Sequence, residues 1–192
     1  MIRLFIALEI PVKIISALLF ERDKLLSSEK LIRWEQKEKL HITLKFLGDT
    51  EETLINNISA ELENIVNRYE PIKLEVSKFG VFRKGKEPKI LWIGMRENYH
   101  LSKFVEEIEK SFCKFGYPIE EKKFKPHITL FRFRGCKDDA KVLSLLEVKL
   151  PALCFEADKI SLIKSELKQT GSVYSSIKNF RLENKGRCYG SR

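Results

Sequence analysis

The tetrapeptide His-Ile-Thr-Leu occurs twice in this chain, within "KLHITLKFLG" (residues 39–48) and within "KPHITLFRFR" (residues 125–134). Both copies alternate polar and apolar residues, which is the period of a strand with one buried face. Residues i and i+2 of a strand share a face, so the histidine and threonine of each copy point together and the isoleucine and leucine point into the core. Each copy is therefore expected to offer one imidazole and one hydroxyl on the same face.

Strand and helix patterns alternate around the two copies. Pro11 suits the first turn of a helix that ends near Leu26, and Thr50 is expected to cap a helix that Pro71 ends. The tail over 183–192 has few apolar residues and is expected to be disordered. The expected strands are 2–8, 31–36, 41–47, 72–82, 89–95, 127–133, 153–167 and 172–182, and the expected helices are 11–26, 50–69, 98–116 and one from about Asp138.

The two units have a similar order, and each contains one histidine tetrapeptide. This order predicts an internal duplication with pseudo-twofold symmetry. Antiparallel sheets flanked by helices make an α+β fold. No linker rich in proline, glycine or serine divides the chain, so residues 1–192 are expected to form a single domain of two pseudo-symmetric lobes.

Composition restricts the function classes. Lysine and arginine number 36 against 27 acidic residues, and the net charge of +9 favours a polyanionic partner such as nucleic acid. Many of these lysines, however, lie beside glutamates on expected helices and solvate a surface. No apolar run reaches the roughly 20 residues of a membrane span. The opening "MIRLFIALEIPVKII" reads as a strand rather than a signal peptide, so a cytoplasmic location is expected.

The cysteines and the third histidine suggest no metal site. The four cysteines are widely scattered, without the two-residue spacing of a zinc or redox motif, and are expected to be reduced. His100 is expected at the surface or at a helix cap. Trp34 and Trp92 are expected in the core or in a cleft wall rather than as base-stacking platforms. Two imidazoles alone leave a zinc site short of ligands.

Two imidazoles and two hydroxyls suit metal-free cleavage of a phosphodiester. An imidazole titrates near pH ~6.5, so one can accept a proton while the other, protonated, donates one. The hydroxyls of Thr43 and Thr129 can donate to phosphoryl oxygens. Lys45 lies on the face of His41 by strict alternation and could reach a phosphate. Arg132 lies on the opposite face from His127 by the same rule, so a phosphate contact there requires a bulge or a twist.

Several longer segments carry a resemblance to a known family: "RLFIALEIP", "RWEQKEKLHITLKFLGD", "FGVFRKGKEPKILWIGM", "FKPHITLFRFR" and "LIKSELKQTGSVYSSI". The chain resembles the two-histidine phosphoesterase superfamily, specifically the RNA 2′,3′-cyclic phosphodiesterases, also called 2′-5′ RNA ligases. The resemblance implies a bilobal fold with the active-site cleft between the lobes. It also implies hydrolysis of a terminal 2′,3′-cyclic phosphate of RNA to a 2′-phosphate, without a cofactor or a metal.

The resemblance further implies roles for five residues. His41 would donate a proton to the leaving 3′ oxygen, and His127 would activate water. Thr43, Thr129 and Arg132 would bind phosphoryl oxygens. The two tetrapeptides are nearly symmetric, so the residues themselves do not distinguish acid from base. The protein is expected to act as a monomer on RNA ends.

Two other functions are considered. The same site run in reverse would act as a 2′-5′ RNA ligase, although no ATP-binding motif is present to drive it. The second is an RNA-binding protein without turnover. Binding alone does not need two titratable groups, so hydrolysis is the preferred prediction.

Overall fold

The protein is described here from a computed structural model, which covers residues 1–26, 32–133, 139–169 and 171–184. One antiparallel sheet of eight strands runs through it, in the order β6-β3-β4-β5-β2-β1-β7-β8. The strands are β1 (Ile2–Glu9), β2 (His41–Thr50), β3 (Ile72–Lys84), β4 (Glu87–Met95), β5 (His127–Arg132), β6 (Cys154–Ala157), β7 (Lys159–Lys168) and β8 (Gly171–Arg181). The α+β fold is therefore confirmed, with one curled sheet in place of several.

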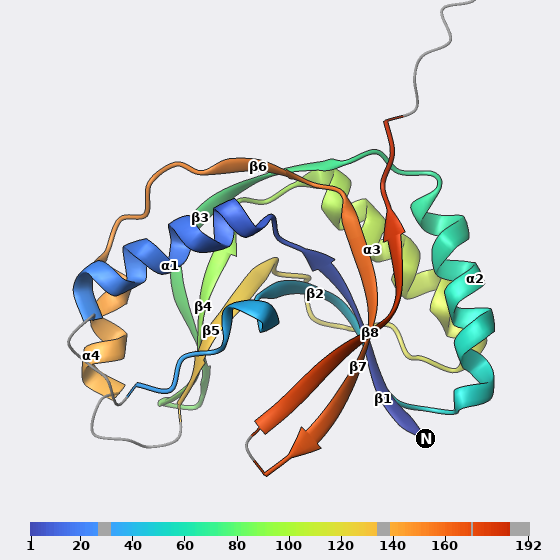
Figure 1. The fold of residues 1–192 in the computed structure, drawn as a ribbon, viewed down its shortest axis with the longest axis horizontal. Helices are drawn as coiled ribbons and strands as arrows, with labels where there is room; N and C mark the ends of the chain where they lie inside the picture. Colours follow the sequence, from blue (N-terminus) through green and yellow to red (C-terminus); the bar gives the residue numbers. More distant parts are fainter. Residues whose placement is uncertain (27–31, 134–138, 170, 185–192) are drawn as a thin grey trace, which may run out of the picture.

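Helices cover the sheet (Figure 1). The α-helices are α1 (Val12–Leu26), α2 (Ile55–Val66), α3 (Tyr99–Phe112) and α4 (Asp139–Leu143). Helices α2 and α3 contact each other, and α3 also contacts β2. Helix α1 passes along the β3–β4–β5 side of the molecule. No helix within the described ranges is long and apolar enough to cross a membrane.

The two tetrapeptides meet in the middle of the sheet. β2 and β5 pair at Ile42 and Ile128, which are both fully buried. Beyond β2, the sheet continues with β1 and then β7, and beyond β5 it continues with β4 and then β3. Three strands therefore lie on each side of the β2–β5 pair, and the internal duplication stays a prediction. The core is continuous across this pair, because residues of both halves belong to one cluster.

Several expected element boundaries are wrong. Residues 32–36 form no strand, although the amide of Glu35 donates to the Leu130 carbonyl at 2.8 Å. Thr50 ends β2 and is not a helix cap; its hydroxyl contacts the Tyr117 hydroxyl at 2.9 Å. The expected single strand over 153–167 is two strands, because β6 pairs with β3 while β7 pairs with β1.

Other local expectations are confirmed. α3 is followed by a turn that ends at Gly116, whose φ of 86° requires the left-handed conformation that glycine adopts freely. His100 is exposed near the start of α3, where Asn98 provides the cap. Cys113 and Cys154 are free and exposed rather than buried. Cys136, Cys188, the helix start at Asp138 and the tail from residue 185 lie outside the described residues.

Candidate active site

A β-bulge follows each threonine, and the two bulges are equivalent. In β2, Ala7 of β1 pairs with Thr43 and Ile6 pairs with Lys45, so Leu44 is the extra residue. In β5, the register with β4 likewise shifts at Leu130. One extra residue reverses the alternation of side chains beyond it. Residues that strict alternation places on one face are therefore found on the other.

The bulge in β2 removes Lys45 from the site. Its side chain is 4% exposed and forms an ion pair with Glu109 of α3. Its ammonium also donates to the Pro118 carbonyl at 2.9 Å. The expected phosphate contact of Lys45 is therefore wrong. Phe46, the next residue, turns outward instead and is 65% exposed.

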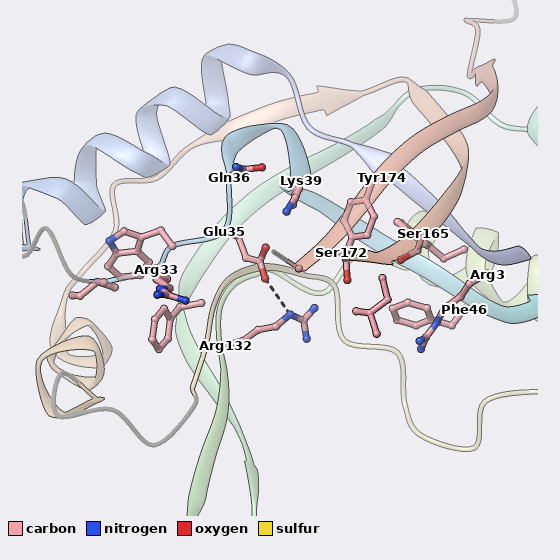
Figure 2. A pocket seen from close by; sticks show the side chains of 16 residues that line it. Arg3, Arg33, Glu35, Gln36, Lys39, Phe46, Arg132, Ser165, Ser172 and Tyr174 are labelled. Carbon is pink, nitrogen blue, oxygen red and sulfur yellow. Dashed lines mark hydrogen bonds and ion pairs between the residues drawn. The ribbon is translucent and has the colours of Figure 1, made fainter. Parts of the chain in front are cut away.

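The bulge in β5 has the opposite effect on the site. Phe131 is buried and Arg132 turns to the face of His127, as a phosphate role requires. Arg132 donates from Nε to Oε1 of Glu35 at 3.1 Å, and its side chain remains 49% exposed (Figure 2). The guanidinium carries five N–H donors, so this bond leaves others for an anion.

The histidines and threonines are half-buried, while the isoleucine and leucine of each tetrapeptide are buried. The shared face of each His-Thr pair is therefore confirmed. Because Ile42 is paired with Ile128, the register places His41 near Thr129 and Thr43 near His127. Four polar side chains meet on one surface of the sheet.

A backbone carbonyl sets the tautomer of His127, and the backbone of Lys39 favours the charged form of His41 against burial. Nδ1 of His127 lies 2.8 Å from the Lys125 carbonyl. A carbonyl only accepts, so the ring nitrogen that it contacts carries the proton. In His41, Nε2 lies 3.1 Å from the Thr43 hydroxyl. While its imidazole is neutral, Nε2 of His127 therefore has a lone pair that can take a proton.

Burial keeps both imidazoles neutral. It is the largest cause that lowers the pKa of His41 to about 4, and His127 adds to it whenever His127 is protonated. Burial also lowers the pKa of His127, with Arg132 and Lys125 contributing. Glu9 opposes the shift at His41 but does not outweigh burial. An anion between the two rings would favour protonation of either one.

Aromatic side chains support each imidazole. The ring of Phe5 stacks on His41 with centroids 5.0 Å apart, and Tyr174 meets His41 edge-on at 5.7 Å. On the other strand, Phe82 meets the His127 ring edge-on at 4.8 Å. These contacts restrict the rotation of both imidazole rings.

The two tryptophans are found where a core or cleft-wall role places them. Trp92 is 6% exposed and lies across Gly80 and Gly94, where an added Cβ would come within 2.2 and 2.7 Å of the indole. Its Nε1 has no hydrogen-bond partner among the described residues. Trp34 is half-buried against Phe131 and lines a cavity.

The cavity adjoins the catalytic candidates and has a volume of about 810 Å³. It shares Phe5, Tyr174 and Arg132 with the surroundings of the histidines. Figure 2 shows that the segment around Glu35, strand β5 and the β7–β8 hairpin all contribute side chains to it. Sequence reasoning singled out only Trp34 and Arg132 of this wall, although the quoted segments "RWEQKEK" and "GSVY" contain several more of its residues.

Three of the cations that line this cavity have no acidic partner among the described residues. Arg3, Arg33 and Lys39 all contribute to its wall. Within the described ranges, no carboxylate is ion-paired to any of the three. Most surface lysines on the helices, by contrast, pair with glutamates, as at Lys110. The net charge of +9 therefore leaves unpaired cations in the cavity.

Comparison with known proteins agrees with this arrangement. Residues 27–169 match the 2′-5′ RNA ligase superfamily. A protein of Aquifex aeolicus named RNA 2′,3′-cyclic phosphodiesterase is 32% identical over 155 residues, covering 78% of this chain and 81% of the relative. A protein of Methanocaldococcus jannaschii with the same name is 30% identical over 181 residues, covering 93% and 99%.

Solved structures show the same fold. Escherichia coli LigT complexed with 3′-AMP superposes with a TM-score of 0.74 at 22% identity, covering 94% of this chain and 98% of LigT. A Thermus thermophilus structure gives a TM-score of 0.79 at 23% identity, covering 95% and 99%. Similarity at these identities establishes the fold alone. The family match over most of the chain establishes more: this chain belongs to the 2′-5′ RNA ligase superfamily.

Proposed function

We propose that this protein hydrolyses the 2′,3′-cyclic phosphate at the 3′ end of RNA to a 2′-phosphomonoester, using His41 and His127 as the acid and base. The observation that supports this most directly is the pairing of β2 with β5 at Ile42 and Ile128, which brings two identical His-Thr pairs together. Relatives that carry the name RNA 2′,3′-cyclic phosphodiesterase support the substrate.

The reaction follows from the two imidazoles. Nε2 of His127 takes a proton from water as the water oxygen attacks phosphorus. The bond from phosphorus to the 3′ oxygen breaks, and protonated His41 gives its proton to that oxygen. The products are a 2′-phosphate and a free 3′-hydroxyl. The substrate anion supplies the field that protonates one imidazole, because burial keeps both neutral in the free protein.

The acid and base roles rest on the resemblance and gain support from the nearby charges. Glu9 is the cross-strand partner of His41 and is fixed by Ser161 and by Lys159, whose ammonium is 2.9 Å from it. A carboxylate beside His41 favours the charged, acidic form. The charges of Arg132 and Lys125 favour the neutral form of His127, although Arg132 also lowers the pKa of His41 and the Lys125 carbonyl raises the pKa of His127. The stronger burial of His41 acts in the opposite direction, because it favours the neutral form of His41. The substrate phosphate must outweigh this burial for His41 to be protonated.

The oxyanion contacts come from the same surface. Thr43 and Thr129 would donate hydroxyl hydrogen bonds to the non-bridging oxygens, where negative charge develops. Arg132 would donate the N–H groups that Glu35 does not use. The remaining part of the RNA would lie in the cavity of about 810 Å³, which is within the range of about 300–1,000 Å³ that holds a whole small ligand. A cytoplasmic location belongs to this proposal, and the free state of Cys113 and Cys154 supports it.

The test uses an RNA oligonucleotide that ends in a 2′,3′-cyclic phosphate. Incubation with the purified protein in EDTA should give a 2′-phosphate, identified by phosphorus NMR. His41→Ala and His127→Ala should each lower the rate by roughly 10²–10⁴-fold, and Thr43→Val should cost less. His100→Ala is the matched control, because His100 is exposed far from the tetrapeptides in sequence.

Two results would overturn the proposal. One is a His127→Ala protein with a wild-type melting curve and near-full turnover. The other is wild-type activity that EDTA abolishes and a single divalent metal restores. In the described part of the chain, no three His, Cys, Asp or Glu residues group as a metal site.

A further inference from the structure

Tyr174 is the residue of the β7–β8 hairpin that reaches the catalytic candidates. It lies on β8 opposite Ser165 of β7, beyond which the hairpin extends past β1. Its ring meets Phe5 edge-on at 5.1 Å and His41 edge-on at 5.7 Å. Phe5 in turn stacks on His41. The three rings therefore form one cluster, in which Phe5 of β1 and Tyr174 of β8 both contact the His41 imidazole.

The hydroxyl of Tyr174 faces the other half of the site. Figure 2 shows the side chains of Tyr174 and Arg132 entering the same cavity, from β8 and from β5. Arg132 interacts with the Tyr174 phenol and lowers its pKa, although burial is the larger effect and the net shift is upward. The phenol therefore stays neutral and can both accept from the guanidinium and donate to an anion.

Arg132 needs a second support to aim at a phosphate. Glu35 holds only its Nε, on the side of the guanidinium nearest the chain. The side chain is 49% exposed and long, so a single anchor leaves the two terminal nitrogens free to rotate about that bond. A second contact from Tyr174 would define the plane of the guanidinium. A fixed plane directs the remaining N–H groups and reduces the entropy lost when an anion binds.

We propose that Tyr174 is a positioning residue that links the two halves of the site: its ring orients the His41 imidazole, and its hydroxyl holds the Arg132 guanidinium toward the reacting phosphate. This inference rests on the proposed function and adds a residue to it. The two parts of the side chain have separate tasks. They can therefore be removed separately.

The experiment compares Tyr174→Phe with Tyr174→Leu. Tyr174→Phe keeps the ring against His41 and removes the hydroxyl, so turnover of cyclic-phosphate RNA should fall about tenfold, as expected for one hydrogen bond to a charged group. Tyr174→Leu removes the ring as well, and should also shift the limb of the pH–rate profile that His41 sets. The control is Tyr117→Phe, which removes a hydroxyl bonded to Thr50 outside the cavity and should leave the rate unchanged.

A double-mutant cycle with Arg132→Gln tests the link. If Tyr174 acts through Arg132, Tyr174→Phe should cost little more once Arg132→Gln is present. Equal fold-losses in both backgrounds would overturn the inference, as would wild-type turnover of Tyr174→Phe. Melting curves on the same samples confirm that each variant is folded.

Binding of inorganic phosphate separates this inference from the proposed function. Tyr174→Phe should weaken phosphate binding in the wild-type background and leave it unchanged in the Arg132→Gln background. This result would support Tyr174 even if the protein proves inactive on cyclic-phosphate RNA. A wild-type protein that binds no phosphate, or a Tyr174→Phe protein that binds it as tightly as wild type, would overturn the inference.

Discussion

The free protein should lose stability between about pH 7.5 and about pH 5, because His41 is buried in its neutral form. Burial lowers its pKa from the ordinary value of 6.5 to about 4. Between these two values the unfolded chain binds a proton that the folded protein refuses, so lower pH favours unfolding. The free energy of unfolding has its full value above about pH 7.5 and falls as the pH drops through 6.5 toward about 4.

The magnitude follows from linkage. For one group with these two pKa values, the free energy of unfolding at about pH 5 should be about 2 kcal/mol lower than at about pH 7.5. His127 should add to the loss, since its pKa is also lowered by burial. Carboxylates with a lowered pKa, such as Glu61 and Glu107, contribute in the same direction at more acidic pH. The His41 part must therefore be isolated by substitution.

Urea unfolding of wild type and of His41→Gln, each at about pH 5 and about pH 7.5, isolates the contribution of His41 to the pH dependence of stability. The variant keeps a polar side chain but does not titrate, so its pH dependence should be weaker by about 2 kcal/mol. His100→Gln is the control and should follow wild type, because His100 is exposed on α3. The same pH dependence in His41→Gln and wild type would show that the imidazole is not held neutral, and the reasoning would fail.

The remaining predictions concern the buried ion pair and the cavity cations. Lys45→Ala should lower the free energy of unfolding by about 3–5 kcal/mol, because it leaves the Glu109 carboxylate buried without its partner. A protein with both Lys45→Met and Glu109→Leu should recover much of that free energy in urea unfolding. No recovery would mean that packing, not charge, dominates at this pair. Arg3→Gln and Arg33→Gln should each reduce the salt slope of binding to an RNA oligonucleotide by about one unit or slightly less. Lys13→Gln, on the exposed surface of α1, should leave the salt slope unchanged. Equal slopes in all three variants would remove the case for RNA in the cavity.

Some elements follow from local signals. The helix end at Gly116 needs only a residue that adopts a positive φ, and the sequence supplies glycine there. The interrupted strand at 153–167 has no such local signal. It divides because Cys154–Ala157 pairs with β3 and Lys159–Lys168 pairs with β1, and both partners are distant in sequence. Thr50 carries a good capping residue type, but pairing with β1 keeps it in β2.

The repeated tetrapeptide alone shows that each histidine shares a face with its threonine, because side chains alternate along any strand and the register of neighbouring strands does not alter this over three residues. It also shows that the two copies are alike enough to form equivalent strands. Which other residues join them depends on how the strands pair in the folded protein. A bulge at Leu44 and another at Leu130 reverse the alternation, so Lys45 goes to the core and Arg132 to the site. A bulge exists only where two strands pair, so its position depends on the partner strand and cannot be read from one strand alone.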